Sequence, residues 1–223
     1  MPLREIPGPA GALAARLDEP SEARRVNPEG LVELGRAGGM VRAAVVFAHP
    51  HPQYGGTMHT KVVYQSAKAL ARIGCAVLRF NFRGVGASAG TFDEGVGEKE
   101  DVRAALDFMH NRYQQAPLWA GGMSFGSWVG LTAGAEDPRV SVLLGVSMPV
   151  LHYDFERVRT SATPKFFIHG ERDDITPLKD MRDFYARASD PKELVVIDAA
   201  DHLFDARVSE VADAIEDLLG DWP

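Results

Sequence analysis

The sequence predicts an α/β fold in which helices cover both faces of a mostly parallel sheet. Short apolar runs alternate along the chain with longer segments whose apolar residues repeat at helical spacing. The short runs lack the polar alternation of a half-exposed strand, which is typical of strands buried on both faces. Strands that alternate with helices of this length form βαβ crossovers, and such crossovers produce a parallel sheet.

Six apolar runs are the expected strands of this sheet. They occupy residues 43–48, 75–82, 118–121, 140–146, 165–169 and 193–197. Helices are expected where apolar residues recur at i, i+3 and i+4, around residues 63–71, 102–113, 178–188 and 208–219. Thr176 and Pro177 are typical of an N-cap and a first helical position, and they predict the start of the third of these helices. The first forty residues are expected to be irregular.

Composition and charge narrow the classes of function. The chain has 223 residues, with 24 Lys and Arg against 31 Asp and Glu, which gives a formal net charge of −7. The positive residues are scattered along the sequence and do not form a cluster. This argues against nucleic acid as a partner. One cysteine allows no internal disulfide, and the sequence contains neither an 18-residue apolar segment nor the apolar core of a signal peptide. We therefore expect one cytoplasmic domain over residues 1–223 that binds no membrane; a homodimer is compatible with the sequence.

Two Gly-x-Ser-x-Gly patterns are candidates for a nucleophile elbow, the tight strand-to-helix turn that exposes a catalytic serine. One surrounds Ser124 and the other surrounds Ser88. Ser124 follows the apolar run 118–121 and precedes a segment that can continue as a buried helix. The residues after Ser88 show no helical period. The context therefore favours Ser124 as the nucleophile and predicts a loop position for Ser88.

A serine nucleophile needs a base, and the base needs an orienting carboxylate. The loops after the last two expected strands offer Asp173 or Asp174 as the acid and His202 as the base. Parallel strands end at one edge of their sheet, so these two loops and the turn at Ser124 are expected to converge there. Spacing alone does not separate Asp173 from Asp174.

Several motifs together resemble the α/β hydrolases, and more narrowly the small lidless carboxylesterases and dienelactone-hydrolase-like proteins. The resemblance covers about residues 43–219 and rests on the segments 49–58, 80–88, 122–126, 169–177 and 201–202. It implies an α/β-hydrolase fold with no separate lid domain. The family's Gly-x-x-Asp motif falls on residues 170–173, which makes Asp173 the acid by resemblance. Dienelactone hydrolases proper use a cysteine nucleophile, whereas the elbow of this chain carries serine.

Hydrolases of this type stabilise the tetrahedral oxyanion with two backbone N–H groups. Phe125, the residue after the nucleophile, is expected to supply the first. Alignment with the family's His-Gly-x pattern selects the amide of His51 as the second, with Tyr54 as the alternative through its amide or hydroxyl. His49, His51 and His59 are not followed by the Asp-His pair of the metallo-β-lactamase type, so neither a metal nor another cofactor is expected.

The sequence thus predicts a serine hydrolase that cleaves small-molecule carboxylic esters through Ser124, His202 and Asp173. Only residues 148–163, with one short helix around 153–158, stand where many α/β hydrolases insert a lid, which predicts a shallow site and a preference for short acyl chains. The expected substrate-binding residues are Tyr54, Met148, Tyr153, Phe155 and Phe204. Activity is expected to fall on acidification through about pH 6.5, because the base must be neutral. Thioesterase or peptidase activity and a non-catalytic binding module are the alternatives.

Overall fold

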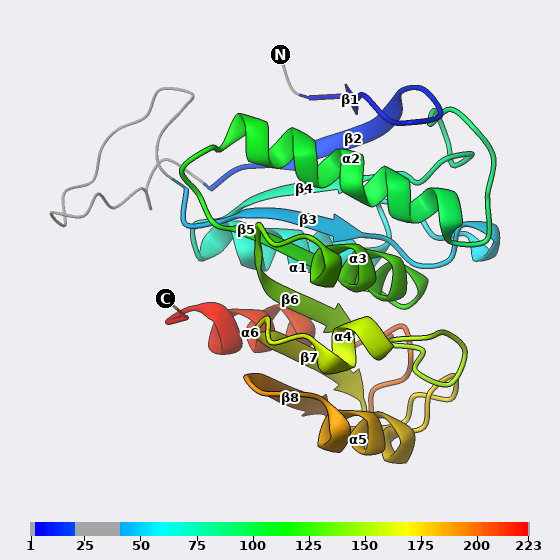
Figure 1. Cartoon of the computed structure of the whole chain (residues 1–223). Helices are drawn as coiled ribbons and strands as arrows, with labels where there is room; N and C mark the ends of the chain where they lie inside the picture. The colour runs from blue at the N-terminus through cyan, green and yellow to red at the C-terminus, as the bar shows by residue number, and fades with distance from the viewer. Residues whose placement is uncertain (1–2, 21–40, 223) are drawn as a thin grey trace, which may run out of the picture.

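The computed structural model describes residues 3–20 and 41–222, in which an eight-stranded sheet is covered by helices on both faces (Figure 1). The strand order is β1-β2-β4-β3-β5-β6-β7-β8, and the neighbours from β4 to β8 run parallel. The parallel strands are β3 (Ala44–Ala48), β4 (Ala76–Phe80), β5 (Leu118–Met123), β6 (Val140–Val146), β7 (Lys165–Gly170) and β8 (Lys192–Ile197). Their bounds match the six apolar runs within two residues, which confirms the predicted α/β fold.

Residues 3–20 contain two strands, which corrects the expectation of an irregular segment for this part of the first forty residues. β1 (Glu5–Ile6) pairs with β2 (Leu13–Asp18), and β2 lies antiparallel beside β4. Leu13 and Ala15 are buried whereas Arg16 is exposed, which is the period-two alternation of a strand with one face on a core. Residues 21–40 lie outside the described residues.

Two cores fill the space between the sheet and its helices. α1 (Lys61–Arg72) and α6 (Val208–Leu219) pack together on one face of the sheet. The opposite face is covered by α2 (Val96–Arg112), α3 (Phe125–Glu136), α4 (Glu156–Thr160) and α5 (Leu178–Arg187). The central strands are therefore buried on both sides, which explains why the sequence shows them as unbroken apolar runs.

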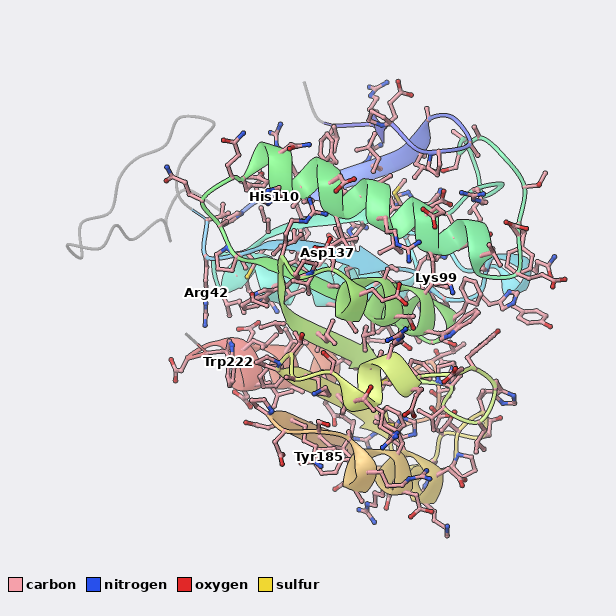
Figure 2. All side chains as sticks on the ribbon, viewed as in Figure 1. Arg42, Lys99, His110, Asp137, Tyr185 and Trp222 are labelled. Atoms are coloured by element: carbon pink, nitrogen blue, oxygen red, sulfur yellow. The ribbon has the colours of Figure 1, made fainter. Side chains whose placement is uncertain are left out.

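The carboxyl ends of the parallel strands share one edge of the sheet, and the loops that follow them meet there. The connection from β6 to β7, residues 147–164, contains only the five-residue helix α4. At the other edge, Arg42 donates hydrogen bonds to the carbonyl oxygens of Gly220 and Trp222, which ties the end of the chain to the start of β3 (Figure 2). Within residues 3–20 and 41–222, no helix has the length and hydropathy needed to cross a bilayer.

Candidate active site

Ser124 occupies a strained turn between β5 and α3. Its backbone has φ 53° and ψ −124°, a conformation that few non-glycine residues adopt and that is often found at functional sites. The flanking glycines make the turn sterically possible. A Cβ on Gly122 would overlap the backbone of Gly126, and a Cβ on Gly126 would overlap the carbonyl oxygen of His49. These two glycines therefore bring the amino end of α3 against the carboxyl ends of β3 and β5.

Hydrogen bonds join Ser124, His202 and Asp173 at the carboxyl edge of the sheet. Nε2 of His202 lies 2.9 Å from Oγ of Ser124, and Nδ1 of His202 lies 2.8 Å from Oδ2 of Asp173. The carboxylate can only accept, so Nδ1 carries the imidazole proton and Nε2 presents its lone pair to the serine hydroxyl. This arrangement allows the hydroxyl proton to move to the imidazole when Oγ attacks an electrophile.

Asp173, rather than Asp174, faces the imidazole, and this resolves what spacing left open. Its Oδ1 accepts the N–H groups of Ile175 at 2.9 Å and Thr176 at 2.8 Å, while Asp174 is exposed. Burial alone would raise the pKa of Asp173. The hydrogen bond and charge of His202, together with the Thr176 amide, outweigh burial and hold that pKa below its ordinary value. The carboxylate is therefore ionised at neutral pH.

The expected N-cap at Thr176 is corrected by the same contacts. α5 begins at Leu178 with Pro177 in the N-cap position, and no side chain caps the helix. The hydroxyl of Thr176 is buried without a hydrogen-bond partner. Because the amide of Thr176 is already used by Asp173, this residue completes the acid loop instead of starting the helix.

Two buried histidines organise the site, and no sequence pattern indicated either role. Nδ1 of His49 donates to the Pro50 carbonyl at 2.6 Å, and its Nε2 accepts the N–H of Phe82 at 3.1 Å. His169 donates from Nε2 to the Thr176 carbonyl at 2.8 Å, and the same nitrogen lies 3.6 Å from Asp173 Oδ2. Burial lowers the pKa of both imidazoles, that of His49 to about 4. Both rings are therefore neutral structural groups.

The two expected oxyanion donors lie on adjoining segments. Phe125 is the first residue of α3, so its N–H belongs to the first helical turn, whose amides have no acceptor within the helix. The ring of His51 lies 4.9 Å from that of Phe125, between centroids, which brings the loop after β3 beside the elbow. The amide of Tyr54 instead donates to the His51 carbonyl at 3.1 Å. This contact favours His51 over the Tyr54 amide as the second donor.

The expected substrate-binding residues divide into two groups. Tyr54, the last residue of the short 3₁₀ helix Pro52–Tyr54, is 86% exposed, and Tyr153 is half-buried; both follow strands at the carboxyl edge. Met148, Phe155 and Phe204 are instead almost completely buried, the first two in the core beneath α3 to α5 and the third in the core beneath α1 and α6. The expectation that these three line a site is corrected: their large apolar side chains gain more from complete burial in the cores.

Ser88, from the other Gly-x-Ser-x-Gly pattern, has a structural role. Its hydroxyl donates to the Asn81 carbonyl at 2.7 Å and accepts the N–H of Ala14 at 2.9 Å, so it joins β2 to the loop after β4. This agrees with its predicted place in a loop.

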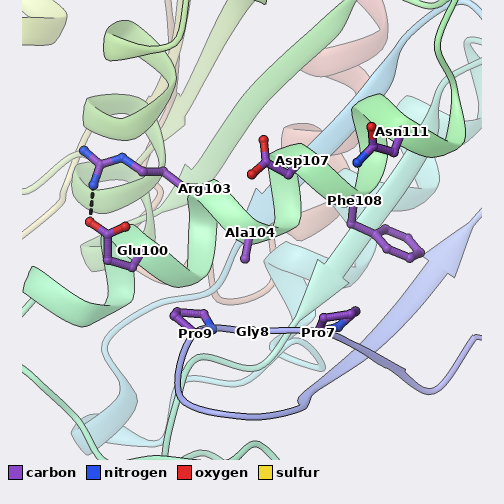
Figure 3. Close-up of a pocket in the computed structure, with 9 residues that line it drawn as sticks. All are labelled: Pro7, Gly8, Pro9, Glu100, Arg103, Ala104, Asp107, Phe108 and Asn111. Atoms are coloured by element: carbon purple, nitrogen blue, oxygen red, sulfur yellow. Dashed lines mark hydrogen bonds and ion pairs between the residues drawn. The ribbon is translucent and has the colours of Figure 1, made fainter.

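A cavity of about 490 Å³ lies away from these residues, between the segment 7–9 and the outer side of α2 (Figure 3). It is lined by Glu100, Arg103, Asp107 and Phe108 among others, and includes none of the residues around Ser124. In the part of the chain that the structure describes, no three His, Cys, Asp or Glu side chains gather in a metal-binding arrangement.

Comparison with known proteins places the chain among similar folds. An uncharacterised protein of Rickettsia prowazekii is 38% identical over 204 residues, which cover 86% of this chain and 85% of that protein. A solved α/β serine hydrolase homologue from Coxiella burnetii has a TM-score of 0.84 and 33% identity, covering 96% of this chain and 95% of its own. An α/β serine hydrolase without a lid, from Xanthomonas campestris, has a TM-score of 0.84 and 31% identity, and the match covers 98% of this chain and 93% of that protein.

The fold and these similarities define the class of the protein, which is an α/β serine hydrolase without a lid domain. The family model described as serine aminopeptidase, S33, matches residues 39–156. The match includes more than half of the chain, and the chain belongs to this family. The resemblance to lidless α/β hydrolases that the sequence motifs indicated is thereby confirmed.

Proposed function

We propose that this protein hydrolyses carboxylic esters of small molecules, with Ser124 as the nucleophile. The observation that carries the proposal is the pair of hydrogen bonds, 2.9 Å and 2.8 Å long, that joins Ser124 through His202 to Asp173. His202 takes the proton from Oγ as Oγ attacks the ester carbonyl. Asp173 holds the imidazole in the required tautomer and stabilises its charged form.

The reaction then proceeds through an acyl-enzyme. The negative charge of the tetrahedral intermediate lies on the carbonyl oxygen, where the amides of Phe125 and His51 stabilise it. His202 returns its proton to the departing alkoxide, and the acyl group remains bonded to Oγ. Water, deprotonated by His202, attacks this ester and releases the carboxylic acid, which restores the serine hydroxyl.

Short acyl groups are the proposed substrates, since the connection between β6 and β7 carries only a five-residue helix where a lid would stand. The description of the family as serine aminopeptidases favours a second candidate, hydrolysis of an N-terminal peptide bond. The same groups serve both reactions, because each needs a nucleophile, an oxyanion site and a proton for the leaving group. Aminoacyl p-nitroanilides therefore belong in the same assay as p-nitrophenyl esters.

The experiment compares Ser124→Ala with Ser88→Ala, which removes the serine of the other Gly-x-Ser-x-Gly pattern. Ser124→Ala is expected to lower kcat for p-nitrophenyl acetate by at least about 10³-fold and to abolish labelling by a fluorophosphonate probe. Ser88→Ala is expected to keep both the wild-type kcat and the labelling by the probe. Near-normal turnover by Ser124→Ala would overturn the assignment of the nucleophile. Faster hydrolysis of palmitate than of butyrate would contradict the proposed chain-length preference, and cleavage of anilides alone would favour the peptidase.

A further inference from the structure

Aromatic side chains gather beside the elbow. The ring of Phe125 lies 4.9 Å from that of His51 and 5.9 Å from that of Phe92, measured between centroids. It also lies 5.8 Å from Tyr153, which stacks on Trp128 at 4.3 Å with 13° between the ring planes. Phe125 is buried, whereas the other four are only partly buried. We call these four residues, His51, Phe92, Trp128 and Tyr153, the aromatic wall.

The aromatic wall is held in place by polar contacts that do not involve its faces. Nε1 of Trp128 donates to the Asp154 carbonyl at 3.0 Å. Glu98 is fully buried and accepts the N–H of Gly95 at 2.7 Å, which fixes the loop that carries Phe92. A Cβ on Gly95 would overlap the ring of Trp128, so glycine at this position leaves room for the indole. The rings are thus positioned before any ligand arrives.

Packing of the core accounts for only part of the aromatic wall: Phe92, Trp128 and Tyr153 pack against the core with one part of their surface and keep the rest exposed. His51 follows β3, Phe92 follows β4, Trp128 lies in the first turns of α3, and Tyr153 follows β6. Exposed aromatic surface that converges from several loops on a nucleophile is typical of a binding site, since apolar surface left in water is unfavourable until a ligand covers it.

The strand order indicates which part of an ester would meet the aromatic wall. The loops after β6, β7 and β8 place Tyr153, Asp173 and His202 on one side of the elbow, and the loops after β4 and β3 place Phe92 and His51 on the other. The leaving alkoxide must lie near Nε2 of His202 to receive its proton. The acyl group is bonded to the other side of the carbonyl carbon and therefore extends away from His202, toward the part of the aromatic wall formed by Phe92 and His51.

We propose that the aromatic wall binds an aromatic ring in the acyl part of the substrate, which makes short arylalkanoyl esters the preferred class. This inference rests on the proposed esterase function and adds the chemistry of the acyl group to it. Edge-to-face or offset-stacked ring pairs contribute about 0.5–1.5 kcal/mol beyond the burial of area, which corresponds to about 2- to 13-fold in kcat/KM for each pair. Phe92, on the side of the elbow away from His202, is the residue that sets this preference.

The test compares two substrates that share a leaving group and differ only in the ring. These are p-nitrophenyl 3-phenylpropanoate and p-nitrophenyl 3-cyclohexylpropanoate, of which the second is the more hydrophobic. The wild-type protein is expected to prefer the phenyl ester by at least about 5-fold in kcat/KM. Phe92→Leu is expected to move the ratio toward about 1, and Tyr153→Leu, on the His202 side of the elbow, is expected to change it less. Since each ratio is measured on one preparation, partial loss of folded protein in a variant cancels.

Tyr185→Leu is the matched control, because Tyr185 lies on α5 beside the amino end of β8, far from the elbow (Figure 2). It is expected to keep the wild-type ratio. A wild-type ratio of 1 or below, or a ratio unchanged in Phe92→Leu, overturns the inference. If the wild type hydrolyses p-nitrophenyl acetate and shows no ring preference, the inference fails alone. If it hydrolyses no ester and Ser124 is not labelled by a fluorophosphonate, the proposed function fails with it.

Discussion

Replacing His49 by glutamine tests the conclusion that a neutral, buried imidazole holds the loop after β3. Desolvation by burial lowers the pKa of His49 from 6.5 to about 4, against the opposing effect of its hydrogen bond to the Pro50 carbonyl. Protonation would also place a second donor at Nε2, where the ring now accepts the N–H of Phe82. Glutamine can still accept this N–H through Oε1 but does not titrate.

The sign of the effect follows from proton uptake. Between about pH 6.5 and pH 4 the unfolded chain binds a proton at His49 and the folded protein does not, so the free energy of unfolding falls as the pH falls. Above about pH 6.5, His49 is neutral in both the folded and the unfolded state, so the folded protein keeps its full stability with respect to this group. Over the full window its loss amounts to about 3 kcal/mol, at about 1.4 kcal/mol for each pKa unit, and about 2 kcal/mol of this is lost by pH 5.

The assay is urea-induced unfolding at pH 7 and at pH 5, followed by tryptophan fluorescence. Between these two pH values the wild type is expected to lose about 2 kcal/mol more stability than His49→Gln, although the variant starts from a lower value at pH 7. His169 has a lowered pKa too, but it is present in both proteins and cancels in the difference. Equal losses in the wild type and the variant would refute the neutral, buried state assigned to His49.

Two further predictions concern the acid and the structural serine. In Asp173→Asn, the amide oxygen keeps the N–H groups of Ile175 and Thr176, so the NH₂ group turns to His202 and forces the proton of the imidazole onto Nε2. We expect kcat for p-nitrophenyl acetate to fall about 10³- to 10⁴-fold with an unchanged far-UV spectrum, and a fall below 10-fold would contradict the role given to the acid. Ser88→Ala leaves the Ala14 N–H and the Asn81 carbonyl without their partner. It should lower the free energy of unfolding by about 1–3 kcal/mol in urea, and no loss of stability would show that Ser88 does not join these segments.

Most of the sheet could be predicted from the sequence, because burial on both faces leaves a local pattern. The parallel strands appear as apolar runs, and the amphipathic helices α1, α5 and α6 keep their apolar residues on one side. β1 and β2 were missed. β1 has only two residues, and in β2 the alternation of Leu13 and Ala15 with exposed Arg16 spans too few residues to separate a strand from a loop.

The site was predicted only in part. The choice of Ser124 over Ser88 followed from the strand before it and the helix after it, which are local features. The choice between Asp173 and Asp174 depended on which side chain turns inward, and adjacent residues in a loop carry no periodicity that decides this. The burial of Phe204 was missed for a similar reason: it lies in a loop without periodicity, and only the structure places it in the core beneath α1 and α6.

By itself, the sequence determined the class of fold, the turn that exposes a serine, and the loops that supply an acid and a base. These are properties of segments of ten to twenty residues, and hydrophobic periodicity and turn chemistry specify them locally. Only the tertiary structure decided which carboxylate meets the imidazole, which histidines are neutral supports, and which aromatic rings remain exposed beside the elbow. Such contacts join residues tens of positions apart, and their geometry is set by how the sheet and helices pack around two cores.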